Sequence, residues 1–301
     1  MTRRALPFLD AEAVRAATPW PALIATLREF FREGCVLPQR HHHTVEVPGE
    51  RDATLLLMPA WRTGVALGVK VVTIVPGNDM RGLPAVAGLY LLLSGTTGEP
   101  LALIDGAELT ARRMVMVGTG RLAPELVAAH TGVRPTVREV AVWGRDPAKA
   151  EALAGRLARE TGLTVTAAPD LEAAVRDADL VSCATTSAQP LVRGAWLRAG
   201  AHLDLVGGFT PAMREADDEA VRRARVWVDT YEGATREAGD IVGPLASGAL
   251  AREAIVGDLF GLCRGEAVGR SDPAEITLFK SVGTALEDLA AATLVVGGSP
   301  A

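Results

Sequence analysis

The chain has 301 residues, of which 49% are hydrophobic and 22% are charged, and its formal net charge is −5. This composition supplies a buried core, fits two domains by length, and excludes global disorder. Lysines and arginines are scattered and aromatic residues make up only 4%, so we expect no nucleic-acid partner. No apolar run approaches the roughly 18–20 residues of a membrane span, so we expect no membrane partner.

The N-terminus and the cysteines favour a cytoplasmic protein. The opening string MTRRALPFLDAEAV has no apolar signal-peptide stretch. Cys35, Cys183 and Cys263 are odd in number and far apart, which argues against a disulfide framework. We expect no metal at His41–His43, because adjacent strand residues alternate faces and no carboxylate or cysteine stands at ligand spacing.

Residues 1–113 predict one or two helices followed by an antiparallel or mixed sheet. The helical patterns are AEAVRAA and WPALIATLREFFREG, and Gly34 is placed to end the second. Strand-like runs separated by glycine and proline turns follow, namely HHTVEV, ATLLLMPAW, GVALGVKVVTIVP and AVAGLYLLLS.

The rest of the chain predicts a parallel sheet and then helices. Short apolar strands alternate with amphipathic helices from Met114 to about Thr230, which is typical of βαβ units. The final segment ITLFKSVGTALEDLAAATLVV has apolar residues at helical spacing and predicts a return to the first domain. We therefore expect an α/β protein with a doubly wound, Rossmann-type domain at 114–274, inserted in a second α+β domain formed by 1–113 and 275–301.

The string MVMVGTGRLAPEL carries the cofactor signal. It predicts a strand, a glycine turn and a helix that contains Ala123, the GxGxxA arrangement of dinucleotide-binding folds. The glycines let the backbone approach a pyrophosphate, and the helix N-terminus offers N–H groups. The alternative is a glycine turn in a cofactor-free domain. The expected nucleotide contacts are Gly118, Thr119, Gly120, Arg121 and Leu122.

The end of the next strand, EVAVW, bears on the choice of nucleotide. No acid stands immediately at its tip, and Gly144-Arg145 places a cation where the 2′-phosphate of NADP(H) would lie. We therefore favour NADP(H), with NAD(H) possible. Two alternatives remain open: Arg145 is a solvated loop charge, or Asp146 binds the ribose.

Two later strand ends are expected beside the nicotinamide. Thr185 follows one strand, and the turn Val206-Gly207-Gly208 follows another. Ligands of open α/β sheets bind at this edge. For the threonine, ordinary loop capping is an equal alternative.

Three cations are candidates for binding a substrate carboxylate. Lys70 interrupts an apolar strand, which is costly without an anionic partner or a ligand. Arg40 follows a turn, and Arg113 directly precedes the nucleotide strand. Together they could hold a carboxylate. The alternative for Lys70 is the solvent face of an edge strand.

Strings over almost the whole chain resemble the ornithine cyclodeaminase/μ-crystallin family. They include LPQR, LMPAW, GVKVVTIVPGN, LALIDGAELTARR, VGTG, ADLVSCATTSAQP, LVGGFTPAMREAD and TLFKSVGTALEDLAAA. The resemblance implies a Rossmann domain inserted in a substrate domain that forms a homodimer.

The resemblance also implies residue roles. Arg40, Lys70 and Arg113 stand where the family binds the substrate carboxylate and polarises the reacting C–N centre. The turn residues from Gly118 to Leu122, with Arg145, Thr185 and Val206 to Gly208, stand where it binds the dinucleotide. Lys280 and Ser281 are implied to lie near the site, with Ser281 toward the cofactor.

Three departures refine the expectation. Phe209 stands where ornithine cyclodeaminases carry an aspartate, so the chain is more similar to the branch that reduces cyclic ketimine acids to L-proline and L-pipecolate. Ala85 replaces a threonine common in the family. A family helix of about twenty residues is missing between Arg113 and Met114, which puts the competence of the chain in question.

Two alternatives to the ketimine reductase stay open. The chain could be an ornithine cyclodeaminase or an amino-acid dehydrogenase that acts on a linear substrate. It could instead be an NADP(H)-binding protein without turnover, since the resemblance includes μ-crystallin-like proteins, which act as ligand carriers.

Overall fold

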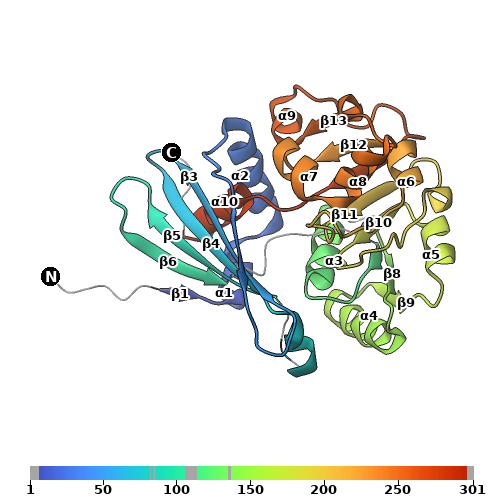
Figure 1. The fold of residues 1–301 in the computed structure, drawn as a ribbon, viewed down its shortest axis with the longest axis horizontal. Coiled ribbons are helices and arrows are strands. Elements are labelled where there is room, and N and C mark those ends of the chain that lie inside the picture. Colours follow the sequence, from blue (N-terminus) through green and yellow to red (C-terminus); the bar gives the residue numbers. More distant parts are fainter. Residues whose placement is uncertain (1–6, 82, 84–85, 106–113, 135–136, 297–301) are drawn as a thin grey trace. The chain divides into compact units, whose positions relative to one another are not determined.

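The computed structural model describes residues 7–81, 83, 86–105, 114–134 and 137–296 (Figure 1). The chain divides into two compact units, Met1–Leu109 with Ala285–Ala301 and Thr110–Thr284. One unit carries a mixed sheet with helices and the other a parallel sheet, so the predicted α/β class with an inserted Rossmann-type sheet is confirmed. None of the described helices is long and apolar enough to cross a membrane.

The first unit is built on a six-stranded sheet with the order β1-β6-β5-β4-β3-β2. All neighbours pair antiparallel except β1 and β6. The strands are β1 (Phe8–Leu9), β2 (His41–Val45), β3 (Ala53–Arg62), β4 (Ala66–Ile74), β5 (Val86–Ser94) and β6 (Pro100–Asp105), and the helices are α1 (Ala11–Ala17), α2 (Trp20–Glu33) and α10 (Ala285–Val295).

The helix α10 covers one face of this sheet. It packs against β3, β4, β5 and α2 (Figure 1). The side chains of Leu56, Met58 and Leu92 on this face are buried. Because strand residues alternate faces, their neighbours in sequence lie on the opposite face of the sheet.

The second unit contains an eight-stranded, all-parallel sheet with the order β13-β12-β14-β11-β10-β7-β8-β9. Its strands are β7 (Val115–Val117), β8 (Glu139–Trp143), β9 (Thr164–Ala167), β10 (Leu180–Cys183), β11 (His202–Leu205), β12 (Ala224–Val228), β13 (Ile255–Asp258) and β14 (Ile276–Lys280). Its helices are α3 (Leu122–Val133), α4 (Pro147–Thr161), α5 (Leu171–Asp177), α6 (Asp218–Arg223), α7 (Tyr231–Glu237), α8 (Gly239–Ser247) and α9 (Leu259–Arg264).

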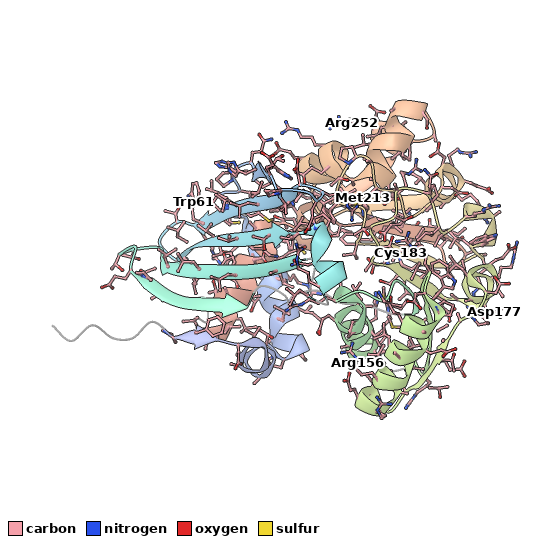
Figure 2. All side chains as sticks on the ribbon, turned by 60° about the horizontal axis from the view of Figure 1, so that its bottom comes forward. Trp61, Arg156, Asp177, Cys183, Met213 and Arg252 are labelled. Carbon is pink, nitrogen blue, oxygen red and sulfur yellow. The ribbon has the colours of Figure 1, made fainter. Side chains whose placement is uncertain are left out.

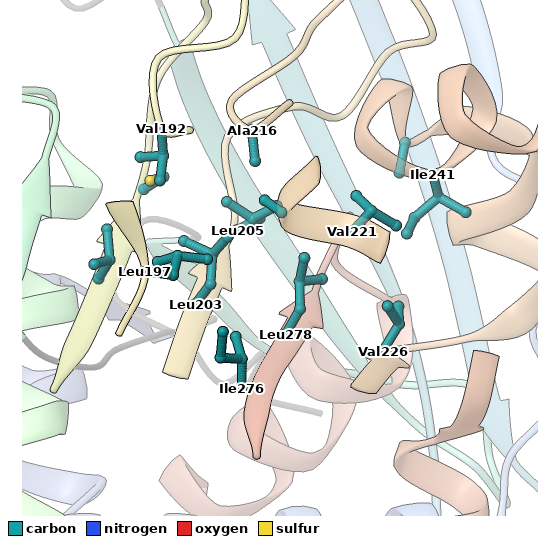
Figure 3. Packing of buried hydrophobic residues seen from close by; sticks show 14 of the residues in the cluster. Val192, Leu197, Leu203, Leu205, Ala216, Val221, Val226, Ile241, Ile276 and Leu278 are labelled. Atoms are coloured by element: carbon teal, nitrogen blue, oxygen red, sulfur yellow. The ribbon is translucent and has the colours of Figure 1, made fainter. Parts of the chain in front are cut away.

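Branched and aliphatic side chains fill the space between this sheet and its helices. Leu203, Leu205 and Leu278 are wholly buried and point into one cluster (Figure 3). Cys183 on β10 is also buried, whereas Arg156 on α4 and Asp177 on α5 face solvent (Figure 2). Cys183 therefore contributes a small core side chain.

The predicted domain boundary near the C-terminus is wrong. We expected residues from 275 onward to return to the first unit as a helix, but Ile276–Lys280 forms β14 between β11 and β12. The return begins at Ala285. A strand buried on both faces is an unbroken apolar run, and periodicity alone cannot tell it from a buried helix.

Candidate active site

The glycine turn after β7 has the geometry of a phosphate-binding loop. Gly118 has φ +125°, and a Cβ there would stand 2.5 Å from the carbonyl oxygen of Ala184, so only glycine fits. Gly120 is exposed and a Cβ there would meet nothing within 4 Å. The turn thus leaves room beside the backbone for a ligand.

The N-terminus of α3 differs from those of its neighbours. Asp146 caps α4 and Asp170 caps α5 through bonds to backbone N–H groups. No side chain caps α3, which follows Arg121. Uncapped N–H groups with the positive end of the helix dipole suit a phosphate, so these residues fit a dinucleotide pyrophosphate.

The tip of β8 lies beside the glycine turn. A Cβ on Gly144 would approach Cγ2 of Thr119 at 2.6 Å. Oδ1 of Asp146 accepts hydrogen bonds from the N–H groups of Ala148 at 3.0 Å and Lys149 at 3.3 Å. Arg145 is exposed and forms no ion pair with the described residues. The aspartate therefore faces its helix, and the arginine is available to a ligand.

A buried carboxylate holds the loops after β10 and β11. Glu215 accepts hydrogen bonds from the backbone N–H groups of Thr185 at 2.6 Å, Gly207 at 2.7 Å and Gly208 at 3.2 Å. Burial raises the pKa of Glu215, and the Lys280 ammonium opposes that shift. Glu215 is not identifiable from the sequence, because an acid in the string MREAD gives no sign of burial.

A cluster of charges lies behind these loops. Lys280, Asp240 and Glu215 are all fully buried. Nζ of Lys280 stands 3.5 Å from Oδ2 of Asp240 and 3.9 Å from Oε2 of Glu215, without hydrogen-bond geometry to either. Oδ1 of Asp240 accepts from the N–H groups of Glu215 and Ala216 at 2.7 and 3.0 Å.

Asp229 holds the loop after β14 in the same way as Glu215 holds the loops after β10 and β11, by accepting hydrogen bonds from backbone N–H groups. It accepts from the N–H groups of Val282 at 2.7 Å and Gly283 at 2.8 Å, and from the Ser281 hydroxyl at 3.2 Å. Burial raises its pKa against these hydrogen bonds. Asp229, like Asp240, is fully buried, so its carboxylate is fixed by these backbone and hydroxyl donors.

In the first unit, Lys70 lies on an interior strand. β4 pairs with β3 on one side and β5 on the other, so the alternative that Lys70 lies on an edge strand is wrong. Its Nζ donates to Oδ1 of Asp288 on α10 at 2.8 Å. The side chains of Lys70 and Asp288 are 22% and 6% exposed.

The sheet register brings further polar groups onto the face of Lys70. Lys70 pairs with Met58 on β3 and with Tyr90 on β5. His41 pairs with Leu57, so extending that register by one residue sets Arg40 opposite Met58. Arg40 lies just before β2, so its place in the row of Lys70 is an extension of the observed register, whereas Arg113 and Ala85 are outside the described residues.

The hydroxyl of Tyr90 belongs to the same row. It is buried and has no hydrogen-bond partner among the described residues. Burial, with the charge of Asp288, raises its pKa. A Cβ on Gly68 would clash with this hydroxyl, so the glycine makes room for the ring.

The residues expected to bind the nucleotide and those expected to bind the substrate thus fall into two sets, one in each unit. The first set comprises the glycine turn, Arg145, and the loops that Glu215 and Asp229 hold. The second comprises Arg40, Lys70 and the newly found Asp288. In the described part of the chain no group of three or more His, Cys, Asp or Glu residues could hold a metal ion.

The sequence profile of the ornithine cyclodeaminase/mu-crystallin family matches residues 11–114 and 110–298. The chain belongs to this family. The two matched segments meet at residues 110–114, where we expect the missing helix. A relative from Paracoccus denitrificans, a Δ1-pyrroline-2-carboxylate reductase, is 39% identical over 287 residues, which cover 89% of this chain and 90% of that protein.

Solved structures of the family have the same fold. Δ1-pyrroline-2-carboxylate reductase of Thermococcus litoralis, in complex with NADH and L-proline, aligns with a TM-score of 0.86 and 30% identity, covering 97% of this chain and 96% of that one. An archaeal alanine dehydrogenase dimer with bound NAD aligns with a TM-score of 0.83 and 26% identity, covering 97% and 95%.

Proposed function

We propose that this family member reduces cyclic ketimine acids, Δ1-pyrroline-2-carboxylate or Δ1-piperideine-2-carboxylate, to L-proline or L-pipecolate. The observation that carries the proposal is the Lys70 ammonium, held at 2.8 Å by Asp288 on an interior strand of the first unit. Extension of the β2–β3 register would set Arg40 in the same row. Its side chain is partly exposed, so a small carboxylate can reach it. The reductases among the relatives, named for this reaction, support the same choice.

Reduction of a cyclic imine acid needs only three things: a hydride donor, a proton on the imine nitrogen, and cations that hold the carboxylate. Hydride transfer requires the donor carbon within about 3–3.5 Å of C2 of the imine. The imine nitrogen must carry a proton, which makes C2 electrophilic. Arg40 and Arg113 would bind the carboxylate, and Lys70 would hydrogen-bond it or give the nitrogen its proton.

The uncapped N-terminus of α3 and the open glycine turn fit a nicotinamide dinucleotide, which supplies the hydride when bound. The residues from Gly118 to Leu122 would hold its pyrophosphate. Thr185 and the Val206–Gly208 turn, which Glu215 fixes, would hold its nicotinamide half, and Ser281 would lie toward it.

Arg145 favours NADP(H) over NAD(H) in this proposal. It is exposed at the tip of β8 next to the glycine turn, while Asp146 is engaged in capping α4. A guanidinium there suits a 2′-phosphate. The two solved relatives described above carry NADH and NAD, so the ratio of NADPH to NADH affinity must be measured.

A homodimer is the assembly that the first unit supports. Its sheet face opposite α10 carries apolar residues such as Leu57, Val71 and Leu89, in one row, and Leu89 is 37% exposed. A solvated face of an antiparallel sheet is normally polar. We propose that a second copy covers this face, and light scattering should give twice the chain mass.

One alternative activity has less support. Phe209 stands on the loop after β11 in place of an acid, and its N–H donates to the Gly207 carbonyl at 2.8 Å. Ornithine deamination with ring closure would lack a base there. Release of ammonia from L-ornithine with catalytic NAD⁺ would support the cyclodeaminase alternative. Turnover of L-alanine would favour an amino-acid dehydrogenase.

The deciding experiment is NADPH oxidation at 340 nm with Δ1-pyrroline-2-carboxylate, repeated with NADH and with Δ1-piperideine-2-carboxylate. We expect imine-dependent oxidation and the formation of L-proline. Binding of NADPH without any oxidation would contradict the proposal. It would favour a nucleotide-binding protein without turnover, with the junction before Met114 as the first region to test.

A further inference from the structure

The Lys70 ammonium has one hydrogen-bond partner among the described residues, Oδ1 of Asp288 at 2.8 Å. This distance is that of a charge-assisted hydrogen bond. An ammonium has three N–H donors, so two remain for a ligand. One N–H of the Lys70 ammonium is thus bonded to Asp288, and the other two can donate to a ligand.

Asp288 comes from the other end of the sequence. It lies in the first turn of α10, 218 residues after Lys70, and this helix packs against β3, β4 and β5. Its side chain is 6% exposed, so its charge is largely removed from water. The position of the Lys70 ammonium therefore depends on where the C-terminal helix docks.

Both partners need this contact. A buried carboxylate without a cation is strongly destabilised, and a lysine without an anchor has a flexible four-carbon chain. Removing the charge of Asp288 would free the Lys70 side chain to leave the row it shares with Arg40. It would also change the charge beside any bound carboxylate.

We propose that Asp288 is a positioning residue that holds the Lys70 ammonium in the orientation that binds the imino-acid substrate. The inference rests on the proposed function, because it assigns Asp288 to the same site. Asp288 makes no contact with the reacting atoms in this proposal and acts through Lys70 alone. The substrate site is then complete only when α10 has docked on the sheet.

The test compares Asp288→Asn, Asp288→Glu and the matched control Glu287→Gln. Glu287 stands in the same first turn and carries the same charge, but it makes no hydrogen bond to Lys70. Each variant is assayed for kcat and KM with Δ1-pyrroline-2-carboxylate, for the Kd of NADPH, and for its melting temperature. The Kd of pyrrole-2-carboxylate, a planar carboxylate that cannot be reduced this way, is measured by calorimetry.

We expect Asp288→Asn to lower kcat/KM and to weaken pyrrole-2-carboxylate binding, each by about tenfold or more. Asp288→Glu, which keeps the charge, should recover part of both. NADPH affinity should stay within about twofold in all variants, and Glu287→Gln should resemble the wild type.

Two results would overturn the inference. Asp288→Asn with wild-type kcat/KM and carboxylate affinity would remove the role of the charge. Equal losses in Asp288→Asn and Asp288→Glu would assign the effect to packing. If the wild type binds pyrrole-2-carboxylate but does not oxidise NADPH, the proposed function fails, and the calorimetry of the variants still decides the role of Asp288.

Discussion

The chain contains three lysines, and two of them lie on interior strands beside acids in opposite circumstances. Lys70 has a side chain that is 22% exposed and one short bond to Asp288. Lys280 is fully buried, 3.5 Å from Asp240, and its Nζ has no hydrogen bond to any residue in the described part of the chain. The comparison shows that a lysine on an interior strand can either face a ligand or balance buried charge, and that the exposure of its side chain separates the two cases.

The burial of Lys280 has a structural explanation. Glu215 and Asp240 hold backbone N–H groups of the loops after β10 and β11, and both carboxylates lie out of water. An uncompensated pair of buried anions would be strongly unfavourable, so a cation among them is required. Lys280 thus stabilises the proposed cofactor loops from the buried side, whereas the Lys70 side chain is 22% exposed at the proposed substrate site.

The largest expected effect is on stability, at Lys280. Lys280→Met removes the cation beside Glu215 and leaves Asp240 only the Arg214 guanidinium, whose Nε stands 3.9 Å from Oδ1, so the free energy of unfolding should fall by about 3–5 kcal/mol. The melting temperature should then fall by roughly 6 °C or more. The control is Lys149→Met on α4, an exposed site that should melt like the wild type. Equal melting of both variants would contradict the structural role.

An intermediate effect is expected at an exposed cation. Arg145 has no ion-pair partner in the described residues, so its removal should leave the melting temperature unchanged. Arg145→Ala should raise the Kd of NADPH by about tenfold, because a charged hydrogen bond to the 2′-phosphate is lost. The Kd of NADH should hardly change. Equal losses for both nucleotides would place Arg145 away from the 2′-phosphate.

The smallest effect concerns an acid whose pKa is set by hydrogen bonds. The hydroxyl and N–H of Ser271, with the Arg225 guanidinium, lower the pKa of Glu275 to about 2. A depressed pKa contributes stability above the ordinary value of 4.5, and this is lost as pH falls toward about 2. The stability difference between wild type and Glu275→Gln should therefore be constant above pH 5 and shrink below 4.5. A difference that grows on acidification would contradict this.

The sequence predicts those parts of the protein that depend on local patterns. The glycine turn at Gly118 follows from the strand–turn–helix string, and the positive φ explains why glycine is needed. Lys70 stands out because a cation interrupts an apolar strand. The family follows from strings such as FKSVG that are distinctive in themselves.

The parts that the sequence could not predict depend on tertiary packing. Asp288 and Glu215 become significant only when α10 docks on the first sheet and when the loops after β10 and β11 close around a carboxylate. The strand Ile276–Lys280 was expected to be helical because it is short and its apolar residues also fit the helical spacing of the segment that follows. An acid gives the same signal in sequence whether it is solvated or buried.

The most direct test of the account is the turnover of Lys70→Ala beside that of Lys149→Ala, with NADPH and Δ1-pyrroline-2-carboxylate. We predict that Lys70→Ala loses about 10²–10⁴-fold in kcat while its NADPH affinity stays near that of the wild type. Its melting temperature should fall, because the Asp288 carboxylate, 6% exposed, loses its cation, so kcat is measured at a temperature where the variant is folded. Lys149→Ala should turn over like the wild type. Undiminished turnover in Lys70→Ala would contradict the proposed site.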